Sequence, residues 1–119
     1  MYAKDPEYNR RILEQGQFQV LVAPEAHERK DTTRQLDTGL NHILAKIAHT
    51  KGIAIGVDSE ELRRLPKKEK AQRIARIIQN IRLCRKANVN LATRGKKEIR
   101  YALLSWGAST AQCKEAQYF

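Results

Sequence analysis

Cysteine and histidine, the residues that most often hold metals or act as nucleophiles, are scarce in this sequence. The chain of 119 residues contains two cysteines and three histidines. Cys84 and Cys113 lie 29 residues apart, with no CxxC pair and no further cysteine to complete a ligand set. The sequence therefore gives little support to a zinc site or a disulfide framework, and we expect both thiols to be buried and reduced.

Long hydrophobic runs are also missing. No stretch approaches the roughly 18 consecutive apolar residues of a membrane-spanning helix, and the N-terminus, MYAKDPEYNRR, has no hydrophobic signal region. We therefore expect a soluble, cytoplasmic protein with no membrane partner. The length predicts a single domain, residues 1–119, with one modest core.

Acidic residues are nearly absent from one third of the chain. Between Leu62 and Arg100 there are 14 Lys and Arg but only two acids, Glu69 and Glu98, which gives this segment a net charge of +12. The whole chain carries +10, so the remainder carries −2. Basicity confined to one contiguous segment favours a surface that binds a polyanion, and the alternative is a solvated, charged helix face.

Helix and strand patterns alternate along the sequence. Apolar residues at helical spacing predict helices, and short β-branched runs bounded by Gly or Pro predict strands. The predicted order is helix 5–16, strand 17–24, loop 25–38, helix 40–52, strand 53–57, short helix 58–66, helix 67–87, strand 89–94, helix 96–107 and a last helical turn within 109–119. Strands separated by helices form parallel βαβ crossovers, which predicts an α/β sheet or part of a barrel.

The helix predicted at 40–52 contains two of the three histidines. We expect Thr38 or Asp37 to cap its start and Gly52 to end it. His42 and His49 lie opposite the apolar stripe and about 10 Å apart along the axis, too far to chelate one ion. The stripe itself is predicted to consist of Leu40, Ile43, Leu44, Ile47 and Ala48.

Two places along the chain are suited to binding phosphate. Asn41 and His42 lie in a first helical turn, where free backbone N–H groups can hold a phosphate, or they simply cap that helix. The run TRGKKEIR, residues 93–100, surrounds a glycine with cations where a strand gives way to a helix. Ligands of parallel α/β folds bind at such carboxyl ends of strands.

Motifs of self-sufficient hydrolases are missing. The sequence contains no GxxxxGK[ST], GxSxG or HExxH motif. Only His27, His42 and His49 are available as histidine ligands, with no HxH pair, whereas metal-dependent phosphoesterases need several His and Asp or Glu ligands. We therefore predict no catalytic residue and no metal site in the polypeptide.

Three stretches carry a resemblance to a known family. DTGLNHILAKIAHTKGIAIGVD, NIRLCRKANVNL and NRRILEQGQFQVLVAPE resemble RNase P protein component 3, a subunit of archaeal and eukaryotic ribonuclease P, and the resemblance runs from Asp5 to about Gly107. The family's strand-to-helix loop usually reads Arg-x-Pro-x-Asp-Leu. Here it is Arg94-Gly-Lys-Lys-Glu98-Ile99, so the resemblance extends to Arg94 but not to a detailed role for Glu98.

The resemblance implies both a fold and a function. Family members form a TIM-like barrel related to metalloenzymes of the polymerase-and-histidinol-phosphatase type, and such barrels have roughly 200 residues or more, so the chain corresponds to a C-terminal half-barrel. The implied function is that of a non-catalytic subunit of the ribonuclease P holoenzyme. It stabilises the RNA that removes the 5′ leader of precursor tRNA in an Mg²⁺-dependent reaction, and it pairs with RNase P protein component 2.

The leading hypothesis is therefore a truncated α/β barrel that binds RNase P RNA and contacts precursor tRNA only indirectly. A metal-dependent phosphoesterase of the parent superfamily and a general basic RNA-binding module are the alternatives. The open edges of a partial sheet also predict self-association or docking on a partner. The candidate RNA-binding residues are Lys67, Lys68, Lys70, Arg73, Arg76, Arg82, Arg85, Lys86, Arg94, Lys96, Lys97 and Arg100.

Overall fold

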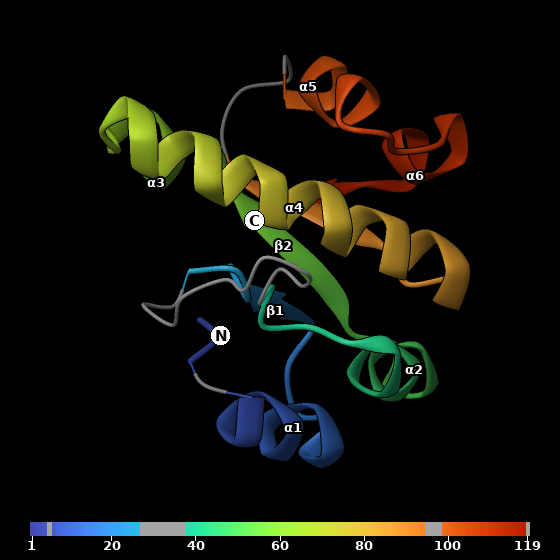
Figure 1. The fold of residues 1–119 in the computed structure, drawn as a ribbon. Coiled ribbons are helices and arrows are strands. Elements are labelled where there is room, and N and C mark those ends of the chain that lie inside the picture. Colours follow the sequence, from blue (N-terminus) through green and yellow to red (C-terminus); the bar gives the residue numbers. More distant parts are fainter. Residues whose placement is uncertain (5, 27–37, 95–98, 119) are drawn as a thin grey trace.

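The protein is built on one parallel β-sheet (Figure 1). The computed structural model describes residues 1–4, 6–26, 38–94 and 99–118. Tyr2 forms a parallel bridge with Val22 at the outer side of the first strand. The α/β class predicted from the sequence is confirmed. The strands follow the chain order across the sheet: β1 (Val20–Val22), β2 (Ala54–Asp58), β3 (Leu91–Arg94) and β4 (Gln117–Tyr118).

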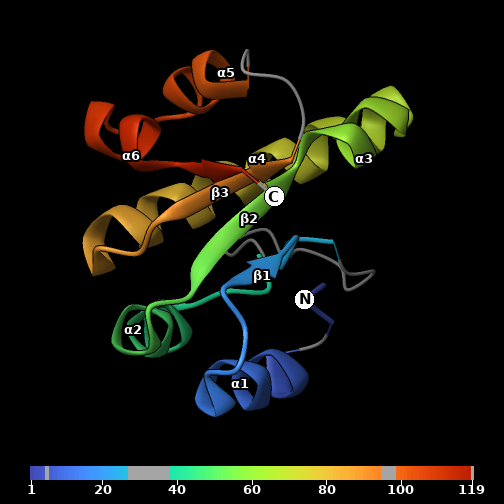
Figure 2. The same cartoon turned by 180° about the vertical axis from the view of Figure 1, so that it is seen from behind.

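The helices cover one side of this sheet. Because the strand order shows no reversal, right-handed crossovers place successive helices on the same face, as in a barrel and unlike a doubly wound sheet. Seen from behind, the strands lie in front of α4, with the other helices around them (Figure 2). The helices are α1 (Pro6–Gln15), α2 (His42–Lys51), α3 (Ser59–Arg64), α4 (Lys67–Ala87), α5 (Ile99–Ser105) and α6 (Thr110–Glu115).

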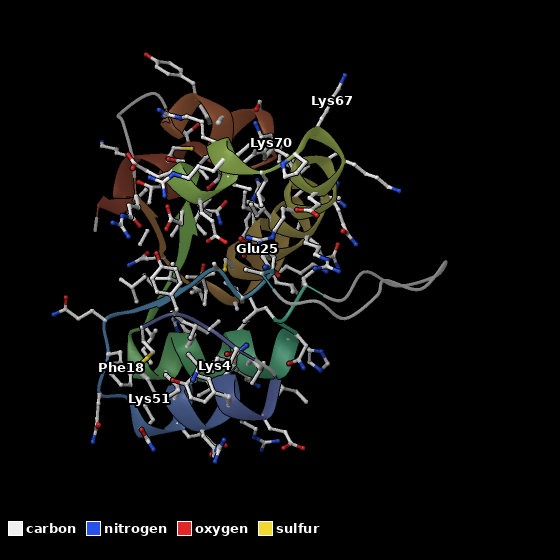
Figure 3. All side chains as sticks on the ribbon, turned by 90° about the vertical axis from the view of Figure 1, so that its left-hand side faces the viewer. Lys4, Phe18, Glu25, Lys51, Lys67 and Lys70 are labelled. Atoms are coloured by element: carbon white, nitrogen blue, oxygen red, sulfur yellow. The ribbon has the colours of Figure 1, made fainter. Side chains whose placement is uncertain are left out.

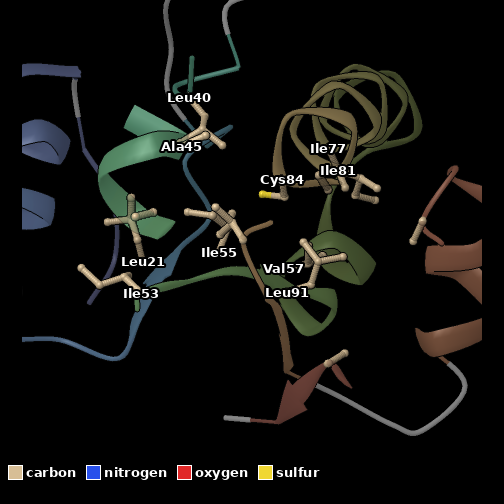
Figure 4. Close-up of a cluster of buried hydrophobic side chains, with 14 of the residues drawn as sticks. Leu21, Leu40, Ala45, Ile53, Ile55, Val57, Ile77, Ile81, Cys84 and Leu91 are labelled. Carbon is tan, nitrogen blue, oxygen red and sulfur yellow. The ribbon is translucent and has the colours of Figure 1, made fainter. Parts of the chain in front are cut away.

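The core lies between the sheet and these helices. Leu21, Ile55 and Leu91 are register partners on adjacent strands, and each is at most 2% exposed. They face Ala45 of α2 and Ile81 of α4, among other apolar side chains (Figure 4). Every described helix contributes at least one buried side chain to this single cluster. The described helices and the strands β1, β2 and β3 therefore share one core.

The opposite side of the sheet carries no described helix, and we call it the helix-free face. Alternation along the strands places Val22, Ala54 and Ala92 on this side, and all three are buried without belonging to the core cluster. Asp58 and Arg94 follow at the carboxyl ends of β2 and β3, where they pair in register. In a complete barrel this face would line the interior.

The last segment differs from the sequence prediction. The three predicted strands are present, and β4 is a fourth strand, parallel to β3 with Ala92 opposite Gln117. The helical turn predicted within 109–119 is present as α6, which ends at Glu115, and the chain then becomes extended. Ser109 does cap α6, through a capping box with Gln112. A two-residue strand has no sequence period of its own, which is why the pattern did not reveal it.

Helix α2 begins and packs differently from the prediction. Its N-cap is Asn41, whereas the hydroxyl of Thr38 bonds the Leu40 carbonyl instead. Gly52 ends the helix in the left-handed conformation, as predicted. Ile43, assigned to the buried stripe, is 48% exposed, because the helix turns its smaller Ala45 toward the sheet.

Three buried polar side chains hold the chain on either side of residues 27–37. The guanidinium of Arg76 donates to the Glu25 carbonyl over 3.0 Å, and Asn80, one turn later on α4, donates to the Thr38 carbonyl over 3.1 Å. Asn9 of α1 donates to the Gly39 carbonyl over 3.4 Å. These bonds satisfy carbonyl groups that are shielded from water.

Candidate nucleic-acid interface

The exposed side of α4 carries cations at its two ends. Lys67, Lys68, Arg85 and Lys86 are all exposed. Each residue of the first pair precedes one of the second by 18 residues, which is about five turns and about 27 Å, so both pairs lie along the same side of the helix. Arg82 is also exposed near the C-terminal pair. A rigid helix therefore presents two separate positive ends to a polyanion.

The other predicted cations of α4 have different surroundings. Lys70 is partly exposed, and Figure 3 shows Lys67 and Lys70 on the far side of Glu25 from Lys51. Arg73 forms an ion pair with Glu61 of α3, with 3.0 Å between Nη1 and Oε1.

Arg76 is only 2% exposed, and its side chain binds the Glu25 carbonyl. The structure therefore places Arg76 in the interior, and we correct its assignment to the RNA-binding surface.

Glu25 itself is a buried acid that the sequence did not single out. Its residue is 3% exposed, and loss of hydration raises the pKa of its carboxyl to about 7. Its own backbone hydrogen bond and the nearby guanidinium groups of Arg73 and Arg76 oppose this rise, and Glu61 adds to it. The acid at the end of β1 therefore titrates near neutrality inside a cluster of charges.

Arg94 lies at the carboxyl end of β3 and belongs to a second polar cluster. Its Nη1 donates to the Tyr2 hydroxyl over 3.1 Å, and this hydroxyl donates to Oδ2 of Asp58 over 2.6 Å. Asp58 is 6% exposed, and its Oδ1 caps α3 by accepting from the N–H groups of Glu60 and Glu61. The side chain of Arg94 is 51% exposed. The cluster joins the N-terminus to the ends of two strands.

Neither Tyr2 nor Asp58 was among the predicted site residues. Asp58 carried a signal, because an acid directly before a short helix is a typical N-cap. Tyr2 carried none, because it is separated by 56 residues from Asp58 and by 92 from Arg94. Of the other predicted cations, Lys96 and Lys97 lie outside the described residues, and the side chain of Arg100 on α5 does also.

The Asn41-His42 pair lies at the start of α2. The Asn41 side chain accepts from the Leu44 N–H over 2.9 Å, so it caps the helix. His42 is exposed and lines a shallow hollow of about 760 Å³ together with Ile43, Lys46 and Glu14. Capping accounts for Asn41, and phosphate binding at this turn stays a prediction.

We expect Asn41→Ala to lower the free energy of unfolding by about 1 kcal/mol, because the Leu44 N–H loses its acceptor. His42→Ala, one residue away at an exposed position, should change it by less than about 0.5 kcal/mol. Urea unfolding of the two variants measures both values. Equal stabilities would contradict the capping role of Asn41.

The cysteines and two of the histidines lie as the sequence predicted. Cys84 and Cys113 are buried and are not joined in a disulfide, and burial raises the pKa of the Cys84 thiol to about 12. His42 and His49 are exposed, as their positions on the helix predicted. Within residues 1–4, 6–26, 38–94 and 99–118, no helix is long and apolar enough to cross a membrane. No cluster of three or more His, Cys, Asp or Glu in the same residues could hold a metal.

Comparison with known proteins identifies the architecture. No protein-family model and no curated protein matches this chain. It is similar to a chain of the cryo-EM structure of archaeal ribonuclease P with mature tRNA, with a TM-score of 0.77 and 18% sequence identity. The two chains share a fold. The similarity covers 96% of this chain and 51% of that chain, so this chain spans about half the length of the structure it matches.

Proposed function

We propose that this chain is a protein subunit of ribonuclease P that binds and stabilises the catalytic RNA. The observation that carries the proposal is the fold shared with a chain of archaeal ribonuclease P over 96% of the present sequence. The resemblance of its sequence to RNase P protein component 3 supports the same assignment and names the component.

The distribution of charge supports an RNA ligand. The exposed cations of α4 have only Glu69 as an acidic neighbour on that helix, so the surface attracts phosphates along its length. Double-stranded RNA is recognised mostly through its shape and backbone, which suits a row of Lys and Arg on a rigid helix. The proposed contacts are Lys67, Lys68, Lys70, Arg73, Arg82, Arg85, Lys86 and Arg94, with Lys96, Lys97 and Arg100 in or beside the segment that follows Arg94.

In this proposal no residue of the polypeptide takes part in the cleavage reaction. The RNA cleaves the 5′ leader of precursor tRNA with Mg²⁺, and the protein holds the RNA in its active fold. The phosphoesterase alternative needs a ligand cluster, for which the described residues offer no candidate set. Leader cleavage by the protein without RNA would favour that alternative.

The edge of the sheet at β4 is the proposed protein-binding surface. β4 is the last strand in the sheet order, and it pairs with β3 on one side only. An open strand edge favours pairing with another chain. We propose that RNase P protein component 2 or a second copy of this chain docks there.

The test compares two sets of substitutions that remove equal charge. In the first, Lys67, Lys68, Arg85 and Lys86 are replaced by Gln. In the second, the exposed cations Arg10, Arg11, Lys46 and Lys51 of α1 and α2 are replaced by Gln. Affinity for the RNase P RNA of the same organism is measured between 50 and 300 mM salt, and an unrelated structured RNA of equal length is the control.

We expect the α4 variant to lose about three to four units of the slope of log K against log salt, because each phosphate contact contributes about 0.7 to 0.9. The α1–α2 variant should keep the slope of the unmodified chain. Equal slopes in both variants would show that the α4 charge is only a solvated face. Equal affinity of the unmodified chain for both RNAs would favour the general RNA-binding module.

A further inference from the structure

In the polar cluster at the carboxyl ends of β2 and β3, each hydrogen bond has a defined donor and acceptor. The hydroxyl of Tyr2 gives its only proton to Asp58 and accepts from Arg94. Arg94 and Asp58 are 3.8 Å apart, too far for a direct hydrogen bond, so the hydroxyl links them. The hydrogen bond to Asp58 also raises the pKa of Tyr2 above its ordinary value of 10, at which the hydroxyl is already protonated at neutral pH.

Asp58 is a fixed anchor for this cluster. One of its oxygens accepts from the N–H groups of Glu60 and Glu61 in the first turn of α3, and the other accepts from Tyr2. Its side chain is only 6% exposed, so water has little access to it. The hydroxyl of Ser59, the next residue, donates to the Arg94 carbonyl and holds the backbone of β3 beside it. Tyr2 therefore holds the guanidinium of Arg94, and Ser59 holds the backbone of the same residue.

Arg94 nevertheless remains accessible. Half of its side chain is exposed, and its hydrogen bond to Tyr2 uses only Nη1 of a planar group that carries five N–H donors. This fork matches the oxygens of a phosphodiester better than a lysine does. Its place at the carboxyl end of a parallel strand is where ligands of such folds bind.

We infer that Arg94 binds a phosphate of the RNA and that Tyr2 and Asp58 are positioning residues that hold its guanidinium in the binding orientation. This inference rests on the proposed function, and it specifies how one of the proposed RNA contacts, Arg94, is held in place. A long side chain that is already ordered loses less conformational freedom when it binds. The positioning hydroxyl therefore contributes to affinity without adding any charge.

The opposing interpretation is purely structural: the cluster only ties the N-terminus to the sheet. The two interpretations differ in one measurable respect. If Tyr2 only tied the N-terminus, removing its hydroxyl would leave RNA affinity unchanged. If Tyr2 positions Arg94, the same change weakens binding while the number of phosphate contacts, and so the salt slope, stays the same.

The experiment measures the RNA dissociation constant against salt for Arg94→Gln, Tyr2→Phe and the double variant. Arg94→Gln should lower the slope by about one unit. Tyr2→Phe should keep the slope and weaken binding about three- to tenfold. The double variant should bind no more weakly than Arg94→Gln alone, because the hydroxyl acts only through Arg94. Tyr101→Phe, at a tyrosine that is 76% exposed on α5, is the matched control and should bind like the unmodified chain.

Each result separates the inference from the proposed function. Unchanged affinity of Tyr2→Phe, or a full additional loss in the double variant, would overturn the positioning role while the α4 result stands. Equal binding of both RNAs by the unmodified chain would overturn the ribonuclease P assignment but still allow the comparison of Tyr2 with Arg94. No binding to either RNA would overturn both. Tyr2 is 46% exposed, so loss of one hydroxyl leaves the core intact, and a thermal melt verifies this.

Discussion

Replacing Gly39 by alanine is expected to lower the free energy of unfolding by at least about 3 kcal/mol, the sum of backbone strain and steric overlap. Gly39 has a φ of +74°, and a Cβ there would lie 1.8 Å from the Pro24 carbonyl oxygen and 2.6 Å from its carbon. Both obstacles are backbone atoms, which cannot rotate away. The turn at residues 23–26 would have to separate from Gly39, and with it the Glu25 carbonyl from Arg76.

Gly52 is the matched control for this prediction. Its φ of +68° is nearly the same, but no atom lies within 4 Å of an added Cβ. Gly52→Ala should therefore cost only the strain of a left-handed alanine, about 1–2 kcal/mol. Urea unfolding at constant slope m measures both changes. Equal losses in the two variants would show that the contact with Pro24 is not a constraint.

Glu25→Gln is expected to remove a pH dependence of stability. The folded pKa of about 7 lies above the ordinary value of 4.5, so the folded chain binds more protons than the unfolded chain between these pH values. The stability that Glu25 contributes is therefore complete below about pH 4.5 and is lost as the pH rises through 7. Between pH 5 and pH 8 the unmodified chain should lose about 2–3 kcal/mol that the Gln variant keeps.

The measurement is urea unfolding of both chains at half-unit steps from pH 5 to pH 8. The groups that act on Glu25 are Arg73 and Arg76 of α4 and Glu61 of α3, and all three stay in place in the Gln variant. Glu115→Gln, at an exposed position on α6, controls for the loss of one carboxylate. Parallel stability curves of the unmodified chain and Glu25→Gln would refute the coupling.

Local sequence signals predicted much of the fold. Helix α4 begins at Lys67 and ends at Ala87, as predicted, because Pro66 precedes it and its apolar positions repeat at helical spacing. Gly52 was assigned as a helix terminator from its type and place alone, and its φ of +68° agrees. Such features depend on residues within a few positions of one another, which is the range that a sequence pattern covers.

The residue pattern of the helix alone could not predict the burial of Arg76. Arg76 is adjacent to Ile77 and one turn before Asn80, on the edge of the buried side of α4. The helical spacing of the apolar residues placed Arg76 off the apolar face, and it did not show the carbonyl groups at Glu25 and Thr38 that Arg76 and Asn80 bind across the fold. A buried arginine is stable only where such acceptors exist, and they come from a distant turn.

The contacts of the polar cluster at Arg94 could not be predicted from the sequence for the same reason. Its contacts depend on the register of β2 with β3, which sets Asp58 opposite Arg94, and on the pairing of Tyr2 with Val22. The sequence predicted parallel strands but not their register, and a slip of one residue would send these side chains to opposite faces. The position of Arg94 at a strand end could therefore be predicted, and its partners could not.

The three buried donors that hold the chain around residues 27–37 have a practical consequence for protein engineering. Because Arg76, Asn80 and Asn9 fix the carbonyls of Glu25, Thr38 and Gly39 independently, the spacing of the two attachment points is set by α4 and α1. A substitution that removes one of these donors leaves a buried carbonyl without its partner, at a cost of about 1–3 kcal/mol. Arg76, Asn80 and Asn9 should therefore be kept unchanged in any redesign of the surface of α4 or α1.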